Sequence, residues 1–400
     1  MDRSKWEYKK LGEVATFERG LTYSKGDEAT FSSKGVLRSN NIDLDTHQLV
    51  FDEIKYLNPN FVIPESKKLK KDSIFICMSN GSKAHLGKVA FADKDYDYAF
   101  GGFMGMIVPK DIYPRYLFYY FLSHNYRNGL EQVGKGANIN NLRFAQLAEF
   151  MVPTPFISDQ QRIVAELDCL NEMIAVKQEQ LKEFDKLAQS IFYDMFGDPV
   201  SNEKGWDIIE LGTKCEVTSF KRVLIEEVVD SGIPFIRGTE LMALSEATKG
   251  EQIDFTLFIT PEHYERVKAI SGVPKVGDLL IPSINSNGNI WILDTDEPRY
   301  YKDGRVLWVH VNHDAFSSEA LKYIMHILLK KTYSLMATGA TFAELKLFVL
   351  RELKVPLPPL NLQQQFADKI SAIEAQKELV KQSIAETQSL FNSRMDYFFN

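Results

Sequence analysis

The chain contains one uncommon sequence step twice. The first copy is VPTPFISDQQRIVAEL at Val152–Leu167, and the second is VPLPPLNLQQQFADKI at Val355–Ile370. Each has a Val-Pro-x-Pro extension, a short polar turn, a pair of glutamines and a run with helical apolar spacing. The copies are separated by about half of the 400-residue chain. A match at this distance predicts a duplication, so the two halves should fold alike.

Further anchors support the duplication. Each half opens with the pattern Trp-x₄-Leu-Gly, at Trp6–Gly12 and at Trp206–Gly212. VLRSNNI at Val36–Ile42 aligns with FIRGTEL at Phe235–Leu241. Between the anchors the halves diverge and change length. This pattern predicts one scaffold that carries two different surfaces.

The repeated step predicts the start of a helix in each half. Ser158 is an N-cap residue type and Gln161 follows three positions later, which is the spacing of a capping box. Asn361 and Gln364 occupy the same places in the second copy. Gly197 predicts a left-handed C-cap for the first helix.

We expect long helices over about 158–196 and 362–398, each with a heptad seam interrupted once, at Lys177 and at Lys377. Such a seam needs a partner helix. The linker 197–205 is too short for the return connection of a parallel pair, so antiparallel pairing is expected. The alternative is that each helix packs on its own domain. The predicted pairing residues are Ile163, Leu167, Leu170, Ile174, Leu181, Phe184 and Ile191 in the first helix, and Phe366, Ile370, Ile373, Val380, Ile384 and Phe391 in the second.

Both halves mix strand-like and helical runs, which predicts an α+β fold. We expect two similar mixed α/β domains at 1–157 and 198–360, joined by two long antiparallel coiled-coil helices at 158–197 and 361–400, with a pseudo-twofold internal repeat. The strand-like runs are 73–79, 103–109, 278–284, 290–294 and 306–312, and the helical runs are 114–132 and 317–336.

Composition is that of a globular protein, with 44% apolar and 25% charged residues, and we expect a cytoplasmic location. No apolar run is long enough to cross a bilayer, and the polar start MDRSKWEYKK does not resemble a signal peptide. The three cysteines lack metal-type spacing and are expected to be thiols in a reducing compartment. A net charge of −7 does not by itself suggest a nucleic-acid partner.

We find no pattern typical of a catalytic or metal site. NPNF at Asn58–Phe61 is one residue away from an amino-methyltransferase signature, but no Gly-rich cofactor motif accompanies it. His310 and His313 are three apart, so on a strand they would point to opposite faces and could not share a metal. We therefore expect no catalytic residue, no metal and no cofactor in this chain.

Polar loops at matching places in the two halves are the candidate recognition elements. SNGSKAHLGK at Ser79–Lys88 follows an apolar strand, and SINSNGN at Ser283–Asn289 is its counterpart. Asn, Ser, Lys and Arg are the side chains that contact base edges and phosphates. The alternative for any single loop is a solvated turn. The candidate DNA-binding residues are Arg19, Arg38, Asn80, Lys83, His85, Lys88, Lys135, Asn138, Asn140, Arg143, Lys221, Arg237, Asn285, Ser286, Asn287, Asn289 and Thr341.

The whole chain resembles the specificity (S) subunit of type I restriction-modification systems. The resemblance rests on the two Pro-x-Pro-then-Gln-Gln steps, each leading into a long helix and each following a variable domain that opens with Trp-x₄-Leu-Gly. It implies that 1–157 and 198–360 are target recognition domains, each reading one half of a bipartite, asymmetric DNA site. The helices would fix the spacer between the half-sites.

The resemblance also implies the partners. They are double-stranded DNA, two methyltransferase (M) subunits and restriction-translocase (R) subunits. A membrane is not expected as a partner. S-adenosylmethionine, ATP and Mg are then expected only in partner subunits. Two alternatives stay open: an S-like subunit of a related or fused restriction system, and a duplicated coiled-coil adaptor that binds protein and not DNA.

Overall fold

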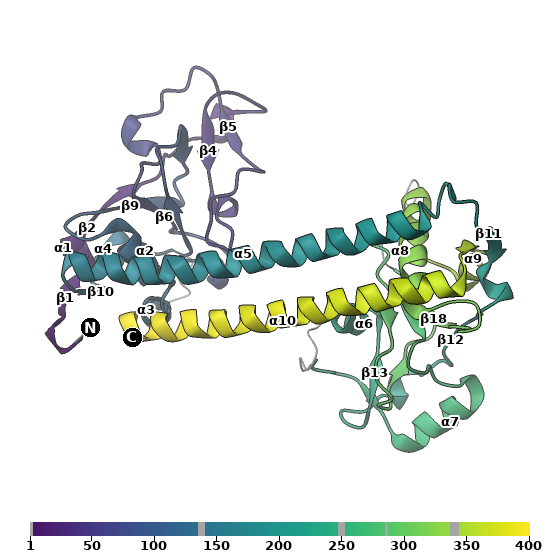
Figure 1. Ribbon diagram of the computed structural model, residues 1–400. Coiled ribbons are helices and arrows are strands. Elements are labelled where there is room, and N and C mark those ends of the chain that lie inside the picture. Colours follow the sequence, from purple (N-terminus) through teal and green to yellow (C-terminus); the bar gives the residue numbers. More distant parts are fainter. Residues whose placement is uncertain (1–2, 135–140, 247–252, 285–286, 337–343) are drawn as a thin grey trace. The chain divides into compact units, whose positions relative to one another are not determined.

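The computed structural model describes residues 3–134, 141–246, 253–284, 287–336 and 344–400. The chain divides into two compact units (Figure 1). Unit 1 comprises Met1–Val176 and Ala385–Asn400, and unit 2 comprises Lys177–Ile384. Each unit therefore contains part of both long helices. No helix among the described residues is long and apolar enough to span a membrane.

Unit 1 is built on two four-stranded sheets and a two-stranded ribbon. The first sheet has the antiparallel order β2 (Ala15–Arg19), β9 (Met104–Pro109), β6 (Ser73–Cys77) and β7 (Val89–Ala92). The second has the order β3 (Glu28–Ala29), β5 (Lys55–Leu57), β4 (Gly35–Leu37) and β8 (Tyr98–Phe100), and its β4–β8 pair is parallel. The ribbon pairs β1 (Glu7–Lys10) with β10 (Met151–Thr154). The helices are α1 (Leu11–Val14), α2 (Pro114–Leu122), α3 (His124–Gly134) and α4 (Phe144–Ala148).

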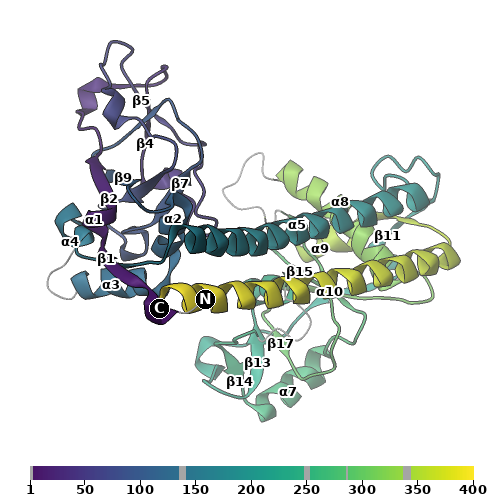
Figure 2. The ribbon, with the colours of Figure 1, turned by 60° about the vertical axis from the view of Figure 1, so that its left-hand side comes forward.

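Unit 2 repeats this plan. Its four-stranded antiparallel sheet has the order β12 (Glu216–Ser219), β18 (Val306–His310), β15 (Leu279–Pro282) and β16 (Trp291–Ile292). A three-stranded sheet has the order β14 (Phe258–Ile259), β13 (Ile233–Ile236) and β17 (Tyr300–Tyr301), with β13 and β17 parallel. The ribbon pairs β11 (Asp207–Glu210) with β19 (Lys354–Leu357). The helices are α6 (Gly238–Glu246), α7 (Pro261–Ser271), α8 (Ser318–Met336) and α9 (Leu347–Arg351), and α7 lies beside the three-stranded sheet (Figure 2). The predicted α+β repeat is confirmed.

The predicted single helix over 114–132 is two helices, α2 and α3, that meet at Ser123. The Ser123 hydroxyl donates to the Tyr120 carbonyl at 2.7 Å and accepts from the Tyr126 amide at 3.3 Å. It therefore satisfies backbone groups at the end of one helix and the start of the next, which makes the break favourable at this position.

The long helices are α5 (Ile157–Phe196) and α10 (Leu360–Phe399). Both begin earlier than predicted, and the expected capping boxes at Ser158 and Asn361 are wrong. The amide of the third residue of each helix instead donates to a backbone carbonyl, that of Phe156 for Asp159 at 2.8 Å and that of Pro359 for Leu362 at 3.0 Å. Gly197 does end α5, with φ of 73° and its amide on the Tyr193 carbonyl at 2.9 Å.

The first glutamine of each repeated step has a structural role. Gln160 and Gln363 are 2% and 0% exposed. The Gln160 side chain accepts from the Tyr113 amide and donates to the Pro155 carbonyl, both at 2.8 Å. Gln363 accepts from the Ser317 amide at 2.9 Å and donates to the Pro358 carbonyl at 2.8 Å. In each unit the buried amide thus joins the long helix to the proline extension before it and to the start of α2 or α8.

Helices α5 and α10 pair antiparallel, as predicted. In unit 1, Glu166 near the start of α5 pairs with Arg394 near the end of α10. In unit 2, Lys177 donates to the Ser383 hydroxyl at 2.7 Å, and Lys377 lies 2.8 Å from the Asp185 carboxylate. As the residue number rises along α5 it falls along α10. The two heptad interruptions are therefore sites where a lysine bonds to the other helix.

The seam is only partly as predicted. The buried members are Ile163, Leu167, Leu170, Ile174, Phe366, Ile370 and Ile373. Leu181, Phe184, Ile191, Val380, Ile384 and Phe391 are only half-buried. Toward the end of each helix the buried positions leave the predicted seam: they are Phe192 and Phe196 in α5, and Met395, Phe398 and Phe399 in α10. A straight helix turns every 3.6 residues, so its apolar stripe drifts away from a strict heptad.

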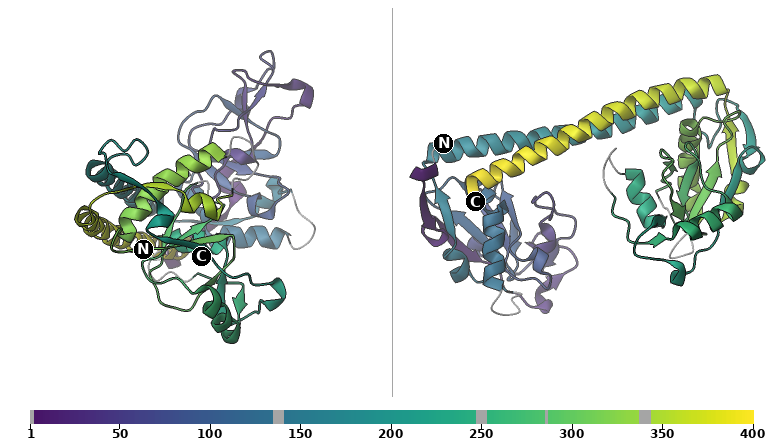
Figure 3. Two further views of the ribbon diagram at one scale, coloured as in Figure 1. Left: turned by 90° about the vertical axis from the view of Figure 1, so that its right-hand side faces the viewer. Right: turned by 90° about the horizontal axis from the view of Figure 1, so that it is seen from below.

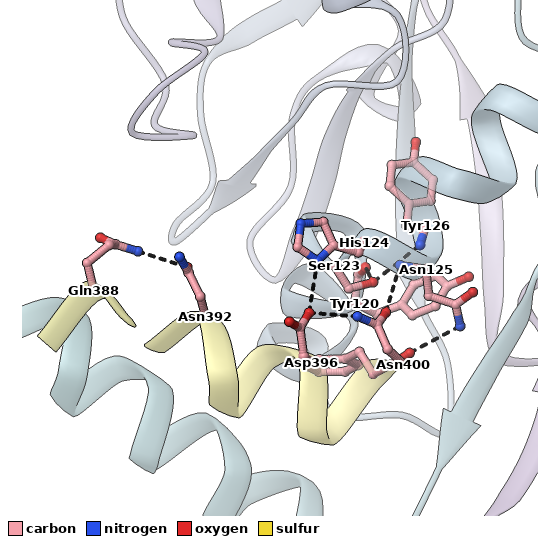
Figure 4. A network of polar contacts seen from close by, with 10 residues as sticks. Tyr120, Ser123, His124, Asn125, Tyr126, Gln388, Asn392, Asp396 and Asn400 are labelled. Atoms are coloured by element: carbon pink, nitrogen blue, oxygen red, sulfur yellow. Dashed lines mark hydrogen bonds and ion pairs between the residues drawn. The ribbon is translucent and has the colours of Figure 1, made fainter. Parts of the chain in front are cut away.

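The end of α10 is part of the unit 1 core. Met395, Phe398 and Phe399 are buried with residues of α2 and the first sheet. The Asn400 side chain accepts from the Asn125 amide at 2.8 Å, and Asp396 lies 2.9 Å from His124 (Figure 4). The Arg3 guanidinium donates to the Asn400 backbone carbonyl at 2.5 Å, so the first described residues lie beside the end of α10 (Figure 3).

Candidate nucleic-acid interface

In unit 1 the polar candidates converge around η3 (Ser39–Asn41), the short helix after β4. Arg38 precedes it, and its amide donates to the Asn41 side chain at 2.8 Å. Asn41 is fully buried and donates to the Val50 carbonyl at 2.9 Å, which fixes the turn. The Arg38 side chain is half-buried, and its Nε has no hydrogen-bond partner among the described residues. This Nε is itself buried, so it is a polar atom that the described fold leaves unsatisfied.

Asn80 joins the loop after β6 to this turn. Its Nδ2 donates to the Ser39 hydroxyl at 3.2 Å, and its Oδ1 accepts from the Ser82 amide at 2.9 Å. The Leu142 amide bonds the Met78 carbonyl at 2.7 Å, which brings the exposed Arg143 to the same loop. The structure thus gathers Arg38, Asn80 and Arg143, although they are far apart in sequence.

Lys88 does not fit the phosphate contact expected of it. It is 3% exposed, and its ammonium donates to the Ile42 carbonyl at 2.8 Å. Burial lowers the pKa of this lysine. Its hydrogen bond to Ile42 ties the β6–β7 connection to the end of η3.

The remaining unit 1 candidates are more dispersed. Arg19 is exposed at the end of β2, where its carbonyl accepts from Lys67 at 2.9 Å. His85 is half-buried in η5 (Lys83–His85), and the backbone of Lys83 lies in the same short helix. No contact in the described part of unit 1 joins the Arg19 side chain to the Asn80 loop.

Sequence reasoning missed Phe103. It is 72% exposed in the turn between β8 and β9, and its carbonyl accepts from the amides of Met78 and Ser79 at 2.9 and 3.1 Å. These bonds place it directly beside the Asn80 loop. An apolar side chain held in a Gly-Gly-Phe turn was the available signal, but a single exposed aromatic residue is common on protein surfaces.

In unit 2, Arg237 occupies the place of Arg38. Its guanidinium pairs with Glu240 in the first turn of α6, with Nε 3.1 Å from Oε1. Burial would raise the pKa of Glu240, but hydrogen bonds from Arg237, from the backbone and from Thr239 outweigh it and lower that pKa to about 2. The carboxylate therefore stays ionised and orients Arg237.

A cavity of about 530 Å³ opens beside this arginine. Lys302 and Arg305, in the turn between β17 and β18, also line it, so three cations share one site. Ser283, at the end of β15, completes its polar lining with Thr239. Apart from Arg237, none of these residues was on the list of candidate residues, although Ser283 is the first residue of the candidate loop Ser283–Asn289. Lys302 and Arg305 are separated from the other lining residues in sequence, so only the fold unites them.

The other unit 2 candidates surround this cavity in part. Asn289 is half-buried and its amide contacts the sulfur of Met242, a lining residue, at 3.4 Å. Asn287 is exposed. Lys221 is exposed, and its amide donates to the Tyr300 hydroxyl at 2.9 Å. Lys135, Asn138, Asn140, Asn285, Ser286 and Thr341 lie outside the described residues.

The two histidines are not on opposite faces of one strand. His310 is the last residue of β18 and His313 lies beyond it. The buried Asp278 carboxylate lies 2.9 Å from Nδ1 of His310. It also accepts a hydrogen bond from the Trp308 indole N–H at 2.8 Å. His310 is thus part of a structural polar cluster. Within the described ranges, no group of three or more His, Cys, Asp or Glu residues could hold a metal ion.

Corresponding positions of the two units carry different chemistry. The Gly101 amide bonds the Leu37 carbonyl in unit 1, as the Lys302 amide bonds the Ile236 carbonyl in unit 2, both at 2.9 Å. By the same criterion Phe103 corresponds to Arg305, and Met78 to Ser283, since the Met78 and Ser283 amides donate to their carbonyls at 2.9 Å. The β8–β9 turn of unit 1, which meets the end of β6, is apolar. The β17–β18 turn of unit 2, which meets the end of β15, is cationic.

Curated relatives resemble this chain over part of its length. It is 31% identical over 189 residues to the type I restriction enzyme StySPI specificity subunit of Salmonella potsdam, covering 46% of this chain and 40% of the relative. It is 29% identical over 205 residues to the EcoKI specificity subunit of Escherichia coli (strain K12), covering 50% and 43%. The matches thus span less than half the length of these two relatives. A putative specificity subunit of Haemophilus influenzae is 24% identical over 289 residues, covering 71% of this chain and 70% of the relative.

Solved structures share the fold over nearly the whole chain. The S subunit of a type I restriction-modification system from M. genitalium matches 99% of this chain and 96% of its own, with a TM-score of 0.54 and 16% identity. A chain from a study of complex assembly and conformational transition of the type I R-M system matches 99% and 97%, with a TM-score of 0.59 and 18% identity. The family model of the type I restriction modification DNA specificity domain matches residues 3–185 and again 203–388. The chain belongs to the family of type I restriction-modification DNA specificity domains, and it contains two of them.

Proposed function

We propose that this chain is the DNA-recognition subunit of a type I restriction-modification complex, and that each unit reads one half of a bipartite, asymmetric DNA site. One observation carries the proposal: the units share a scaffold but place different side chains at corresponding positions of their recognition turns, Phe103 and Met78 in one and Arg305 and Ser283 in the other. Two different surfaces on one scaffold suit two different half-sites. Side chains of these types read bases by apolar contact or by hydrogen bonds.

The proposed partners follow from the family. The Salmonella and Escherichia relatives are named as specificity subunits of restriction enzymes. We propose that this chain binds double-stranded DNA together with two methyltransferase subunits, and that restriction-translocase subunits join for cleavage. S-adenosylmethionine, ATP and Mg would be bound by those subunits. The chain itself would then catalyse no reaction, and the complex would act in the cytoplasm, where bacterial DNA is found.

The long helices are proposed to set the spacer. The bonds between Glu166 and Arg394 and between Asp185 and Lys377 fix the register of α5 against α10. A fixed register would hold the separation of the half-sites constant. One heptad inserted after both Val176 and Ser383 would keep the seam intact and lengthen both helices by about 10 Å. We expect the preferred spacer to grow by about three base pairs, at roughly 3.4 Å per step, with both half-sites retained.

A methylation map tests the proposed function. Genomic DNA from cells with and without this gene, both expressing the partner subunits, is sequenced for modified bases. We expect one bipartite motif to be methylated only when the gene is present. Purified chain with methyltransferase subunits should also retain DNA that carries this motif and release DNA in which one half-site is scrambled. Identical maps with and without the gene, together with retention that ignores sequence, would favour the alternative of an adaptor that binds protein and not DNA.

A further inference from the structure

We propose that the cavity between α6, the end of β15 and the β17–β18 turn of unit 2 binds a single phosphate of the DNA backbone. This inference rests on the proposed function and deepens it, because it assigns an anchoring role to residues that the sequence pattern did not indicate. The occupant is defined by chemistry: a tetrahedral oxyanion whose oxygens only accept hydrogen bonds.

The lining of the cavity offers positive charge without a carboxylate. Arg237, Lys302 and Arg305 line it, and neither aspartate nor glutamate does. Lys302 is half-buried, and its ammonium has no partner among the described residues. Arg305 is exposed and pairs with Glu344, a residue outside the lining, at 3.5 Å. Glu240, which does not line the cavity, pairs with Arg237. Among the described residues the Lys302 ammonium is thus uncommitted, and the two arginines present their remaining N–H donors beside it, which favours an anion.

One lining residue, Ser283, has a buried hydroxyl without a partner among the described residues. Ser283 is 0% exposed, and its Oγ has no hydrogen-bond partner in the part of the chain that the structure describes. Its backbone is satisfied, because the amide donates to the Arg305 carbonyl at 2.9 Å and the carbonyl accepts from the Leu345 amide at 2.7 Å. Nearly all buried polar groups in native proteins are paired, and an orphan costs stability unless a ligand satisfies it.

The donors suit a phosphate. The Arg305 fork, the Lys302 ammonium and the Ser283 hydroxyl all donate, and the first residues of α6, Gly238 and Thr239, also line the cavity. The N-terminal end of a helix favours an anion, in addition to the charged side chains. Unit 1 has Gly101, Phe103 and Met78 at the positions of Lys302, Arg305 and Ser283, so it lacks this set. The anchor is therefore specific to unit 2.

Salt dependence provides the first test. The full chain, assembled with its methyltransferase subunits, is titrated with DNA that carries the mapped site at several salt concentrations. Neutralising one phosphate contact lowers the slope of log K against log salt by about one. We expect this loss for the Lys302→Gln/Arg305→Gln double variant, with binding weakened by a similar factor on cognate and scrambled DNA. Lys268→Gln, which removes an exposed α7 cation that does not line the cavity, should leave the slope unchanged. A wild-type slope in the double variant would overturn the proposal.

Ser283→Ala separates a ligand contact from a structural role. Removing an unpartnered buried hydroxyl should leave the thermal midpoint of the DNA-free chain unchanged or slightly higher. DNA affinity should fall about tenfold, because hydrogen bonds to charged groups are the stronger ones. A lower midpoint with unchanged affinity would show that the hydroxyl serves the fold alone and would contradict the assignment.

The source of the phosphate is identified by chemical substitution of the DNA. Methylphosphonates, which lack the charge, are scanned across the second half-site and the adjoining spacer. One position should weaken wild-type binding and have no additional effect on the double variant. If no position is coupled in this way, while millimolar inorganic phosphate raises the thermal midpoint of the wild type and not of the double variant, the cavity binds free phosphate and the DNA assignment is wrong. Failure of the wild-type complex to retain site-specific DNA would instead count against the proposed function.

Discussion

The Glu166 carboxylate of α5 accepts a hydrogen bond from the Arg394 guanidinium of α10 at 3.0 Å, although the two residues are far apart in sequence. The same guanidinium lies over the rings of Tyr397 and Phe398, with centroids at 4.9 and 4.4 Å. Arg394 thus connects the start of one long helix to the end of the other inside unit 1. A contact between the start of α5 and the end of α10 is what an antiparallel pair of helices requires.

A crosslink across this contact is the first prediction. In a Cys169→Ser background, which removes the exposed native thiol, Glu166→Cys and Arg394→Cys should be joined rapidly by a short bismaleimide within one chain. The pair Glu166→Cys and Lys369→Cys, with the second cysteine near the start of α10, should remain unlinked. The products are resolved by electrophoresis after cleavage between the two sites. The reverse preference would indicate parallel helices.

The buried glutamine of the repeated step gives the second prediction. Gln363→Ala leaves the Ser317 amide and the Pro358 carbonyl without their partner, so unit 2 should lose about 1–3 kcal/mol of unfolding free energy. The neighbouring Gln364 is exposed, so Gln364→Ala should change stability by less than about 0.5 kcal/mol. In a Trp6→Phe chain the remaining tryptophans, Trp206, Trp291 and Trp308, all lie in unit 2 and report urea unfolding. Equal effects of the two substitutions would refute the structural role.

The sequence predicted the duplication, the fold class and the two long helices, because periodicity and repeated motifs are encoded locally. It misplaced the helix starts, since Ser158 and Asn361 match a capping pattern that the Phe156 and Pro359 carbonyls make unnecessary. It also assigned no role to Gln160 and Gln363. Their partners, Tyr113 and Ser317, become neighbours only when the domain folds.

The candidate site was predicted only in outline. Arg38, Asn80 and Arg237 lie where loops converge, as expected for loops that follow apolar strands. Lys88 is buried with its ammonium on the Ile42 carbonyl, a partner that only the folded chain supplies. Ser283, Lys302 and Arg305 come together through pairing between β15 and β18, which no local pattern of three separate residues reveals.

The Arg237–Glu240 pair gives a prediction about pH. The pKa of Glu240 is lowered to about 2 in the folded chain from an ordinary value of 4.5. Its ionised form is therefore favoured by folding, and this stabilisation is complete above the ordinary pKa and is lost as the pH falls toward 2. Glu240→Gln should cost roughly 3 kcal/mol at pH 7, and the difference from wild type should shrink steadily below about pH 4.5. Urea titrations in the Trp6→Phe background measure it; a cost independent of pH would contradict the prediction.

Phe103 gives a prediction about specificity. Its exposed ring lies beside the Asn80 loop, so Phe103→Ala should weaken discrimination at one or two base pairs of a single half-site, by about 1–3 kcal/mol for each. Phe31 is also largely exposed in unit 1, at 77%, and it packs on Tyr56. Phe31→Ala therefore serves as the matched control and should leave the preference intact. Competition binding with singly substituted sites decides between these outcomes, and unchanged preferences for Phe103→Ala would remove this residue from the reading surface.

The central claim is that each unit reads its own half-site, and an exchange of one reading surface tests it most directly. Residues 1–157 are replaced by the corresponding segment of a family member with a known target, and the methylation produced with the same partner subunits is mapped. The account predicts that one half-site changes to that of the donor, while the other half-site and the spacer length stay as in the parent. A map in which both half-sites change, or in which the parental motif persists unchanged, would contradict it.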